Sequence, residues 1–345
     1  MSLPAPRGPL SKTLLDVLTG GAAVTALTAA AGSVDVDRPA ADVLGDGDLQ
    51  LALYLMYQLH YGGLDGVDDG WEWDPALIGA RGRLEAVIEA AIRSSVATTP
   101  GTVTSLPRNL FAMAAADTGP SLAAHVARHA TLEQVRELLI MRSPYQLKEG
   151  DPQTFAIPRL RGRAKAALVE IQSDEYGGGR LDRMHATLFA TSMRALGLDD
   201  APGAYLDQVP AVVLASNNAL SLFALHRRLR GALCGHLAAF EMTSSLPAKR
   251  WVSGLQRLGL GTDASEFFDE HVEADAVHEQ IAAHDLCGAL VAAEPRLLDD
   301  VVLGAATCLA MDAAVARHTL DAWAAGRSAL RTSSTLQRLQ DRTSA

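Results

Sequence analysis

Two histidines and an aspartate recur at helical spacing in the segment His271-Val-Glu-Ala-Asp275-Ala-Val-His278. On a helix, steps of four and three residues place these three side chains within roughly 60° of one another. Imidazole and carboxylate ligands without thiolate suit iron, manganese or zinc. A solvated helical face would show the same pattern, so this segment alone leaves both interpretations open.

Further acidic and histidine side chains lie upstream of this segment. Glu175 and His185 are separated by the run Gly177-Gly-Gly179, which would break a helix. The two side chains therefore converge only if the chain bends at these glycines. Glu241 lies in an otherwise apolar helical stretch. A carboxylate there needs a partner, and a bound cation is one.

Each of these side chains also has an ordinary structural explanation. Glu149 can be a surface residue near a helix end, Glu241 can pair with Arg227 or Arg230, and His185 can be a hydrogen-bonded core histidine. Taken together, four carboxylates balance the charge of two divalent cations, and three neutral imidazoles complete their coordination. We therefore predict a dimetal centre in a helical bundle. Its ligands are Glu149, Glu175, His185, Glu241, His271, Asp275 and His278.

The elements that must position these ligands are helices. Alanine and leucine dominate, and apolar residues recur every three or four positions, which predicts an all-α fold. The turn-rich segments 61–75 and 96–108 interrupt the pattern. The predicted helices are Leu49–His60, Gly82–Ser94, Leu132–Leu147, Arg161–Glu175, Arg183–Leu196, Ala219–Met242, Ala264–Ala283 and Pro295–Gly326.

Helix length suggests how the 345 residues are divided. Helices before about residue 105 are fewer and shorter than those after it. We predict an N-terminal helical extension over 1–105, a bundle over 106–330 and a flexible tail over 331–345.

Charge and cysteine content restrict the class of protein. The formal net charge of −10 disfavours binding to nucleic acid. The uncharged run Val17–Val34 is too weakly apolar to span a membrane, so no membrane partner is expected. Three cysteines without metal-finger spacing fit a reducing, cytoplasmic compartment.

The order of these motifs is similar to that of a known family. Lys148-Glu149-Gly-Asp-Pro, the run Glu170–Gly179, His185, Glu241 and the 271–278 segment resemble the haem-oxygenase-like diiron oxidases, also described as iron-containing redox enzymes. The resemblance spans about residues 130–325. It implies a haem-oxygenase-like multi-helix bundle, two Fe(2+) ions per chain held by the residues named above, and O2 as co-substrate.

The resemblance also bears on the reaction. Members that oxygenate amines carry an additional histidine, which His271 resembles, so the expected substrate is a small amine or amino acid that undergoes N-oxygenation. Desaturation, oxidative C–C cleavage or decarboxylation, and iron binding without catalysis, are the alternatives. An external electron donor and a homodimer are left open. Asp174, Tyr176 and His284 are candidates to orient the imidazole ligands through hydrogen bonds.

Two other classes of enzyme are disfavoured. A haem enzyme would have to bury four acids beside the porphyrin, which is costly. A serine or cysteine hydrolase would need a nucleophile beside a histidine, and no recognisable elbow of that kind occurs in the sequence.

Overall fold

The computed structural model describes residues 1–98 and 101–332, except that the side chains of 273–276 lie outside the description. Helices make up the fold, and the described residues contain no strand. The predicted all-α class is confirmed. The predicted tail falls almost entirely on 333–345, outside the described residues.

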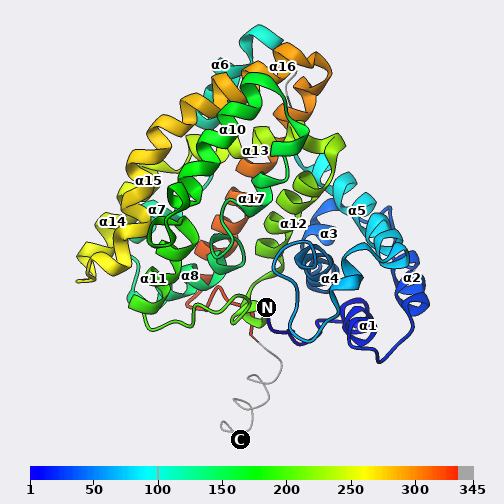
Figure 1. The fold of residues 1–345 in the computed structure, drawn as a ribbon. Helices are drawn as coiled ribbons and strands as arrows, with labels where there is room; N and C mark the ends of the chain where they lie inside the picture. Colours follow the sequence, from blue (N-terminus) through cyan, green and yellow to red (C-terminus); the bar gives the residue numbers. More distant parts are fainter. Residues whose placement is uncertain (99–100, 333–345) are drawn as a thin grey trace, which may run out of the picture.

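The first five helices gather on one side of the molecule (Figure 1). Asp46 caps the N-terminus of α4 by accepting hydrogen bonds from the backbone of Asp48 and Leu49, and Asp74 caps α5 in the same way. The bounds of these helices are α1 Pro9–Leu18, α2 Val24–Gly32, α3 Ala40–Leu44, α4 Gly47–Gln58 and α5 Pro75–Ser95.

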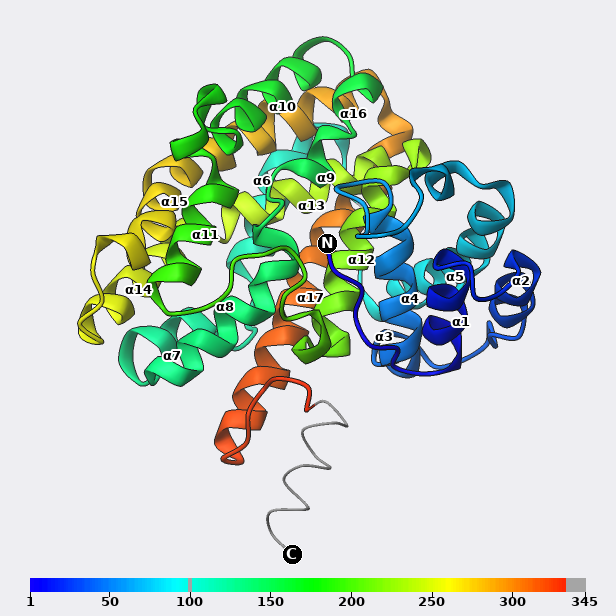
Figure 2. The same cartoon turned by 60° about the horizontal axis from the view of Figure 1, so that its bottom comes forward.

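The remaining helices form a bundle around α17, which runs through its middle in both views (Figures 1 and 2). The predicted helices near 132–147, 161–175, 183–196 and 295–326 are present with similar bounds. The bundle comprises α6 Leu106–Ala115, α7 Leu122–Arg128, α8 Leu132–Gln146, α9 Asp151–Thr154, α10 Gly162–Glu175, α11 His185–Ala195, α12 Ala211–Leu225, α13 Arg230–Met242, α14 Ser245–Arg257, α15 Thr262–Gln280, α16 Ala289–Ala293 and α17 Leu298–Ala324.

One predicted helix is wrong. The sequence predicts a single helix over 219–242, but α12 ends at Leu225 and α13 begins at Arg230. The Arg159 guanidinium, from a segment far away in sequence, donates hydrogen bonds to the last carbonyls of α12, those of Ala224 and Leu225. These carbonyls have no partner within the helix, so a distant donor stabilises its end there.

Close contact between α13 and α17 depends on two glycines. A Cβ on Gly235 would lie 1.9 Å from the Val301 carbonyl oxygen, and one on Gly304 would lie 1.8 Å from the Ala232 oxygen. Only hydrogen in place of a side chain lets the two backbones approach so closely. This contact fixes the depth of α13, which carries Glu241.

The N-terminal helices contact the bundle directly. Asn218 on α12 donates a 2.9 Å hydrogen bond to the Gln50 carbonyl on α4, and the Tyr54 hydroxyl donates to the Pro144 carbonyl on α8. The two segments therefore share an interface. The proposed boundary near residue 105 stays a prediction.

None of the described helices combines the length and the apolar character that crossing a bilayer requires.

Candidate metal centre

Five elements bring six of the predicted ligands together inside the bundle. Glu149 follows α8, Glu175 ends α10, His185 begins α11, Glu241 lies on α13, and α15 carries two histidines. All six side chains are between 1 and 7% exposed. They are Glu149, Glu175, His185, Glu241, His271 and His278.

The two histidines of the 271–278 segment therefore do not lie on a solvated face. His271 and His278 are both buried, and so is Glu241. Arg230 pairs with Glu294, while an Oε2 of Glu241 lies 3.5 Å from Nδ1 of His278. The ordinary explanations for these residues, a surface position or an arginine partner, do not hold.

One half of the centre consists of Glu149, His185 and His271, whose ligand atoms all lie within 4.8 Å of one another. Nε2 of His271 lies 3.8 Å from Oε2 of Glu149. The His185 and His271 rings have centroids 4.4 Å apart. Two imidazoles and a carboxylate thus converge on one point, which matches the donor set of an iron, manganese or zinc site.

The other half consists of Glu175, Glu241 and His278, again within 4.8 Å. Nδ1 of His185 lies 3.0 Å from Oε2 of Glu175, so the two halves adjoin. Glu175 therefore contacts both groups, and its carboxylate would be available to a metal ion in either.

The glycine run provides the predicted bend between Glu175 and His185. Gly177, Gly178 and Gly179 have φ values of 60°, 61° and 82°, a left-handed region that glycine adopts readily. The chain reverses there between α10 and α11, which brings the two side chains into contact.

Hydrogen bonds at the far ring nitrogens define which atom of each histidine on α15 faces the centre. Nδ1 of His271 lies 2.6 Å from the Phe267 carbonyl oxygen, an acceptor, so this nitrogen carries the proton and Nε2 is left as the ligand atom. Nε2 of His278 lies 2.9 Å from Oδ2 of Asp174, which leaves Nδ1 facing Glu241. Such outer hydrogen bonds are typical of metal-binding histidines. Of the three expected orienting residues, Asp174 has this contact, whereas the Tyr176 hydroxyl bonds to Asp151 and His284 lies near Phe111.

Two buried atoms of the centre have no hydrogen-bond partner among the described residues. They are Nε2 of His271 and Oε2 of Glu149, which lie 3.8 Å apart. A lone pair on this nitrogen faces the carboxylate, and an ionised carboxylate has no proton to donate to it. Unpaired buried polar atoms are costly, and a cation between them removes the cost. The other close contacts are ion pairs, between His185 and Glu175 at 3.0 Å and between His278 and Glu241 at 3.5 Å. The donor set therefore fits bound metal ions.

Without metal, protons stabilise the centre. Burial, reinforced by Glu175, raises the pKa of Glu149 well above its ordinary value. Burial disfavours a charged imidazole, but the carboxylate of Glu175 outweighs it and raises the pKa of His185 to about 9. Glu241 does the same for His278, whose pKa is also about 9. Metal ions entering the centre must displace these protons.

The remaining member of the predicted set, Asp275, lies on α15 with its side chain outside the described residues. Its role as a ligand stays a prediction.

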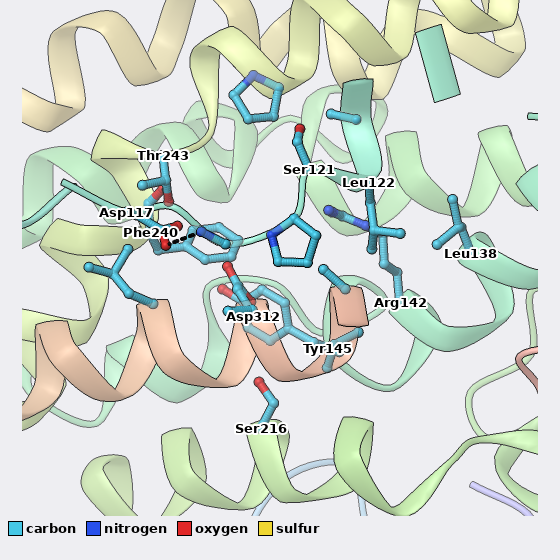
Figure 3. A pocket seen from close by; sticks show the side chains of 18 of the residues that line it. Asp117, Ser121, Leu122, Leu138, Arg142, Tyr145, Ser216, Phe240, Thr243 and Asp312 are labelled. Carbon is cyan, nitrogen blue, oxygen red and sulfur yellow. Dashed lines mark hydrogen bonds between the residues drawn. The ribbon is translucent and has the colours of Figure 1, made fainter. Parts of the chain in front are cut away.

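Two adjoining cavities lie beside the centre. A small one of about 70 Å³ is lined by Glu149 and His271. A larger one of about 450 Å³ shares several lining residues with it, including Trp251 and two that Figure 3 labels, Arg142 and Asp312. The larger cavity is of the size that small-molecule sites have.

Sequence reasoning missed the polar residues of this cavity. Arg142 and Asp312 each look like ordinary charged positions on helices, and His236 lies in the same apolar stretch as Glu241. His236 is buried and lines the larger cavity, and burial lowers its pKa to about 4, so it is neutral. A histidine in an otherwise apolar stretch was the one available signal.

Comparisons with known proteins show what the chain is similar to. The model of the iron-containing redox enzyme family matches residues 136–313. Nitrosourea synthase of Streptomyces achromogenes subsp. streptozoticus is 25% identical over 170 residues, which cover 49% of this chain and 36% of the synthase. The chain thus aligns with well under two thirds of that relative. A solved CADD-like protein of unknown function from Nostoc punctiforme PCC 73102 has a TM-score of 0.46 and 16% identity, covering 61% of this chain and 91% of its own.

Proposed function

The chain belongs to the family of iron-containing redox enzymes, and on that premise we propose that it is a non-haem diiron oxygenase that N-oxygenates a small amine or amino acid. One observation carries the proposal. Two adjoining groups of three buried ligand atoms, each with at least one carboxylate and one histidine, converge inside the bundle.

Two Fe(2+) ions would be held by Glu149, His185 and His271 in one group and by Glu175, Glu241 and His278 in the other. Bound iron supplies the electrons that reduce O2. The chain itself orients the imidazoles through the Phe267 carbonyl and Asp174. It also provides a cavity that adjoins the centre and is large enough to hold a small substrate.

N-oxygenation is favoured over the alternatives by two observations. The synthase relative is named for nitrosourea, a type of compound that contains a nitrogen–oxygen bond. His271 faces the centre with an unprotonated Nε2, as expected for the additional histidine of N-oxygenating members. A cytoplasmic location is part of the proposal, because the three cysteines are free and buried, which suits a reducing compartment.

Anaerobic reconstitution with Fe(II) tests the proposal. We expect two iron ions per chain and, after O2 is admitted with a panel of amines and amino acids, a product that gains oxygen on nitrogen from labelled O2. His271→Ala should lose this product, while His129→Ala, an exposed histidine outside the centre, should keep it. Failure of the wild-type protein to bind iron or to consume O2 would refute the proposal. A product with a new double bond or a shortened carbon chain would instead favour desaturation or C–C cleavage.

A further inference from the structure

The larger cavity contains two opposite charges that do not neutralise each other. Arg142 on α8 and Asp312 on α17 line both this cavity and the small one beside Glu149 (Figure 3). They attract each other electrostatically, yet among the described residues they form no ion pair with each other or with any other side chain. Both charges are therefore available to a ligand.

Arg142 is built to bind an anion. Its guanidinium stacks over the Trp251 ring at 5.2 Å, and the side chain is half-buried. Among the described residues no acceptor takes any of its hydrogen bonds, although a guanidinium has five to donate in a planar fork that matches a carboxylate. A carboxylate supplied by a ligand would give these donors an acceptor inside the cavity.

Asp312 offers the complementary charge. Its side chain is exposed where it lines the cavity, and no hydrogen bond from the described residues reaches its carboxylate. Asp117 lines the same cavity and adds a second negative charge nearby. An ammonium group is the ligand that this side of the cavity favours.

The positions of Arg142 and Asp312 also indicate how a ligand would be oriented in the cavity. Both lie where the cavities meet, and the small cavity, about 70 Å³, extends to Glu149 and His271. The larger cavity, about 450 Å³, extends away from the centre and is lined by apolar side chains such as Leu138 and Leu220. A molecule with both charges at one end would place that end beside the metal ligands and its remainder in the larger cavity.

We propose that the substrate is an α-amino acid whose carboxylate binds Arg142 and whose ammonium group binds Asp312, with its side chain in the larger cavity. This inference rests on the proposed function and narrows it, because a simple amine is then a poor substrate. The nitrogen nearest the metal ligands is the α-nitrogen.

Binding measurements test the inference separately from catalysis. Isothermal titration is carried out on metal-free protein and on anaerobic Fe(II)-loaded protein. The probes are the proteinogenic amino acids and L-norleucine, each compared with the amine left by decarboxylation and the acid left by deamination; for L-norleucine these are pentylamine and hexanoate. We expect at least one amino acid to bind about tenfold or more tightly than either single-charge counterpart.

Substitutions at the two charged residues test which of them binds the carboxylate of the ligand and which binds its ammonium group. Arg142→Gln should weaken binding of that amino acid and its acid about tenfold or more and leave the amine unchanged, and Arg142→Lys should fall between. Asp312→Asn should weaken the amino acid and the amine and leave the acid unchanged. Arg317→Gln and Asp321→Asn, exposed positions on α17 outside the cavity, are the controls.

Two results would each overturn the inference. In one, no amino acid of the panel binds more tightly than its amine or its acid. In the other, the Arg142→Gln variant binds the amino acid as tightly as the wild type does. Iron content and O2 consumption are measured on the same samples. A protein that oxidises amines without this charge selectivity refutes the inference alone, whereas a protein that binds amino acids but no iron refutes the proposed function.

Discussion

Replacing Glu149 with glutamine should make the metal-free protein more stable and at the same time remove the stabilisation that iron gives. The carboxyl of Glu149 is buried, and its Oε2 lies opposite the unprotonated Nε2 of His271 without a hydrogen-bond partner among the described residues. In Glu149→Gln the new amide can donate to that nitrogen, while its oxygen still accepts from the Gln146 side chain, which now bonds Oε1 at 3.2 Å.

The magnitude follows from the cost of an unsatisfied buried group, about 1–3 kcal/mol. For a chain of this length the unfolding entropy is roughly 0.7 kcal/mol/K, so the melting temperature of the metal-free variant should rise by about 1.5–4 °C. Because the pKa of Glu149 is raised in the folded state, the wild-type carboxyl costs stability at every pH above its ordinary pKa. The gain should therefore be larger at pH 8 than at pH 5.

Iron should raise the melting temperature of the wild-type protein much more than that of Glu149→Gln. A metal at 100 times its dissociation constant adds about 2.7 kcal/mol, or about 4 °C here, to the wild-type protein. Glu149→Gln should lose most of this rise, because one group loses its carboxylate ligand. Calorimetric melting of metal-free and Fe(II)-loaded protein under anaerobic conditions measures both effects.

Glu137, on the helix α8 that precedes Glu149, is the matched control. Its Oε2 accepts hydrogen bonds from the Trp323 indole at 2.8 Å and the Ala329 backbone at 2.9 Å, so it is a satisfied structural carboxylate. Glu137→Gln should not raise the melting temperature, and iron should stabilise it as it does the wild type. A metal-free Glu149→Gln protein that melts at or below the wild type, or that keeps the full iron effect, would refute the reasoning about the unpaired carboxyl.

Three further outcomes are expected. Metal uptake should release protons and its affinity should rise with pH up to about 9, because the pKa values of His185 and His278 are about 9 without metal; titration calorimetry in buffers of different ionisation enthalpy measures this, and a pH-independent affinity would contradict it. Asp174→Asn should lower metal affinity about 10- to 100-fold with little change in melting temperature, since its contact orients His278; equal affinity would show that the contact is incidental. Gly235→Ala should destabilise the fold by about 1–3 kcal/mol through a clash with α17, whereas Gly79→Ala, which meets open space on α5, should not, and equal melting curves for the two would contradict the close-packing argument.

The fold was predictable where local pattern decides it. The helices α8, α10 and α11 follow apolar periodicity within one unbroken stretch, and their predicted bounds agree with the structure to within a few residues. The break between α12 and α13 was not predictable, because periodicity continues through it and the donor that ends α12 is Arg159, more than sixty positions away. The change from α15 to a π-helix over Ile281–Gly288 likewise leaves no local signal.

The metal ligands could be predicted from the sequence, whereas the charged residues of the cavity could not. A glutamate in an apolar helix is unusual enough to be noticed singly, as Glu241 was, whereas His271 and His278 were noticed by their helical spacing. Arg142 and Asp312 are not unusual in a helix, and only the folded arrangement shows that both charges face one cavity without pairing. A metal ligand in an unusual sequence context can be predicted from the sequence. A charged residue that matters because it has no ion-pair partner can be recognised only in the folded structure.

The N-terminal helices contribute to the centre although they supply none of the predicted ligands. Lys148, the neighbour of Glu149, lies with its ammonium 4.1 Å from the centre of the Tyr61 ring and 4.9 Å from that of Tyr54, and it donates a 3.1 Å hydrogen bond to Gln58. Cation–π contacts of this kind are strongest when water is excluded, and Lys148 is enclosed by protein here. These contacts hold the turn after α8 in place, and that turn carries Glu149. The same three residues, all before position 105, therefore help to fix the distance between Glu149 and His271, and a bundle without them would lack that constraint on its first ligand.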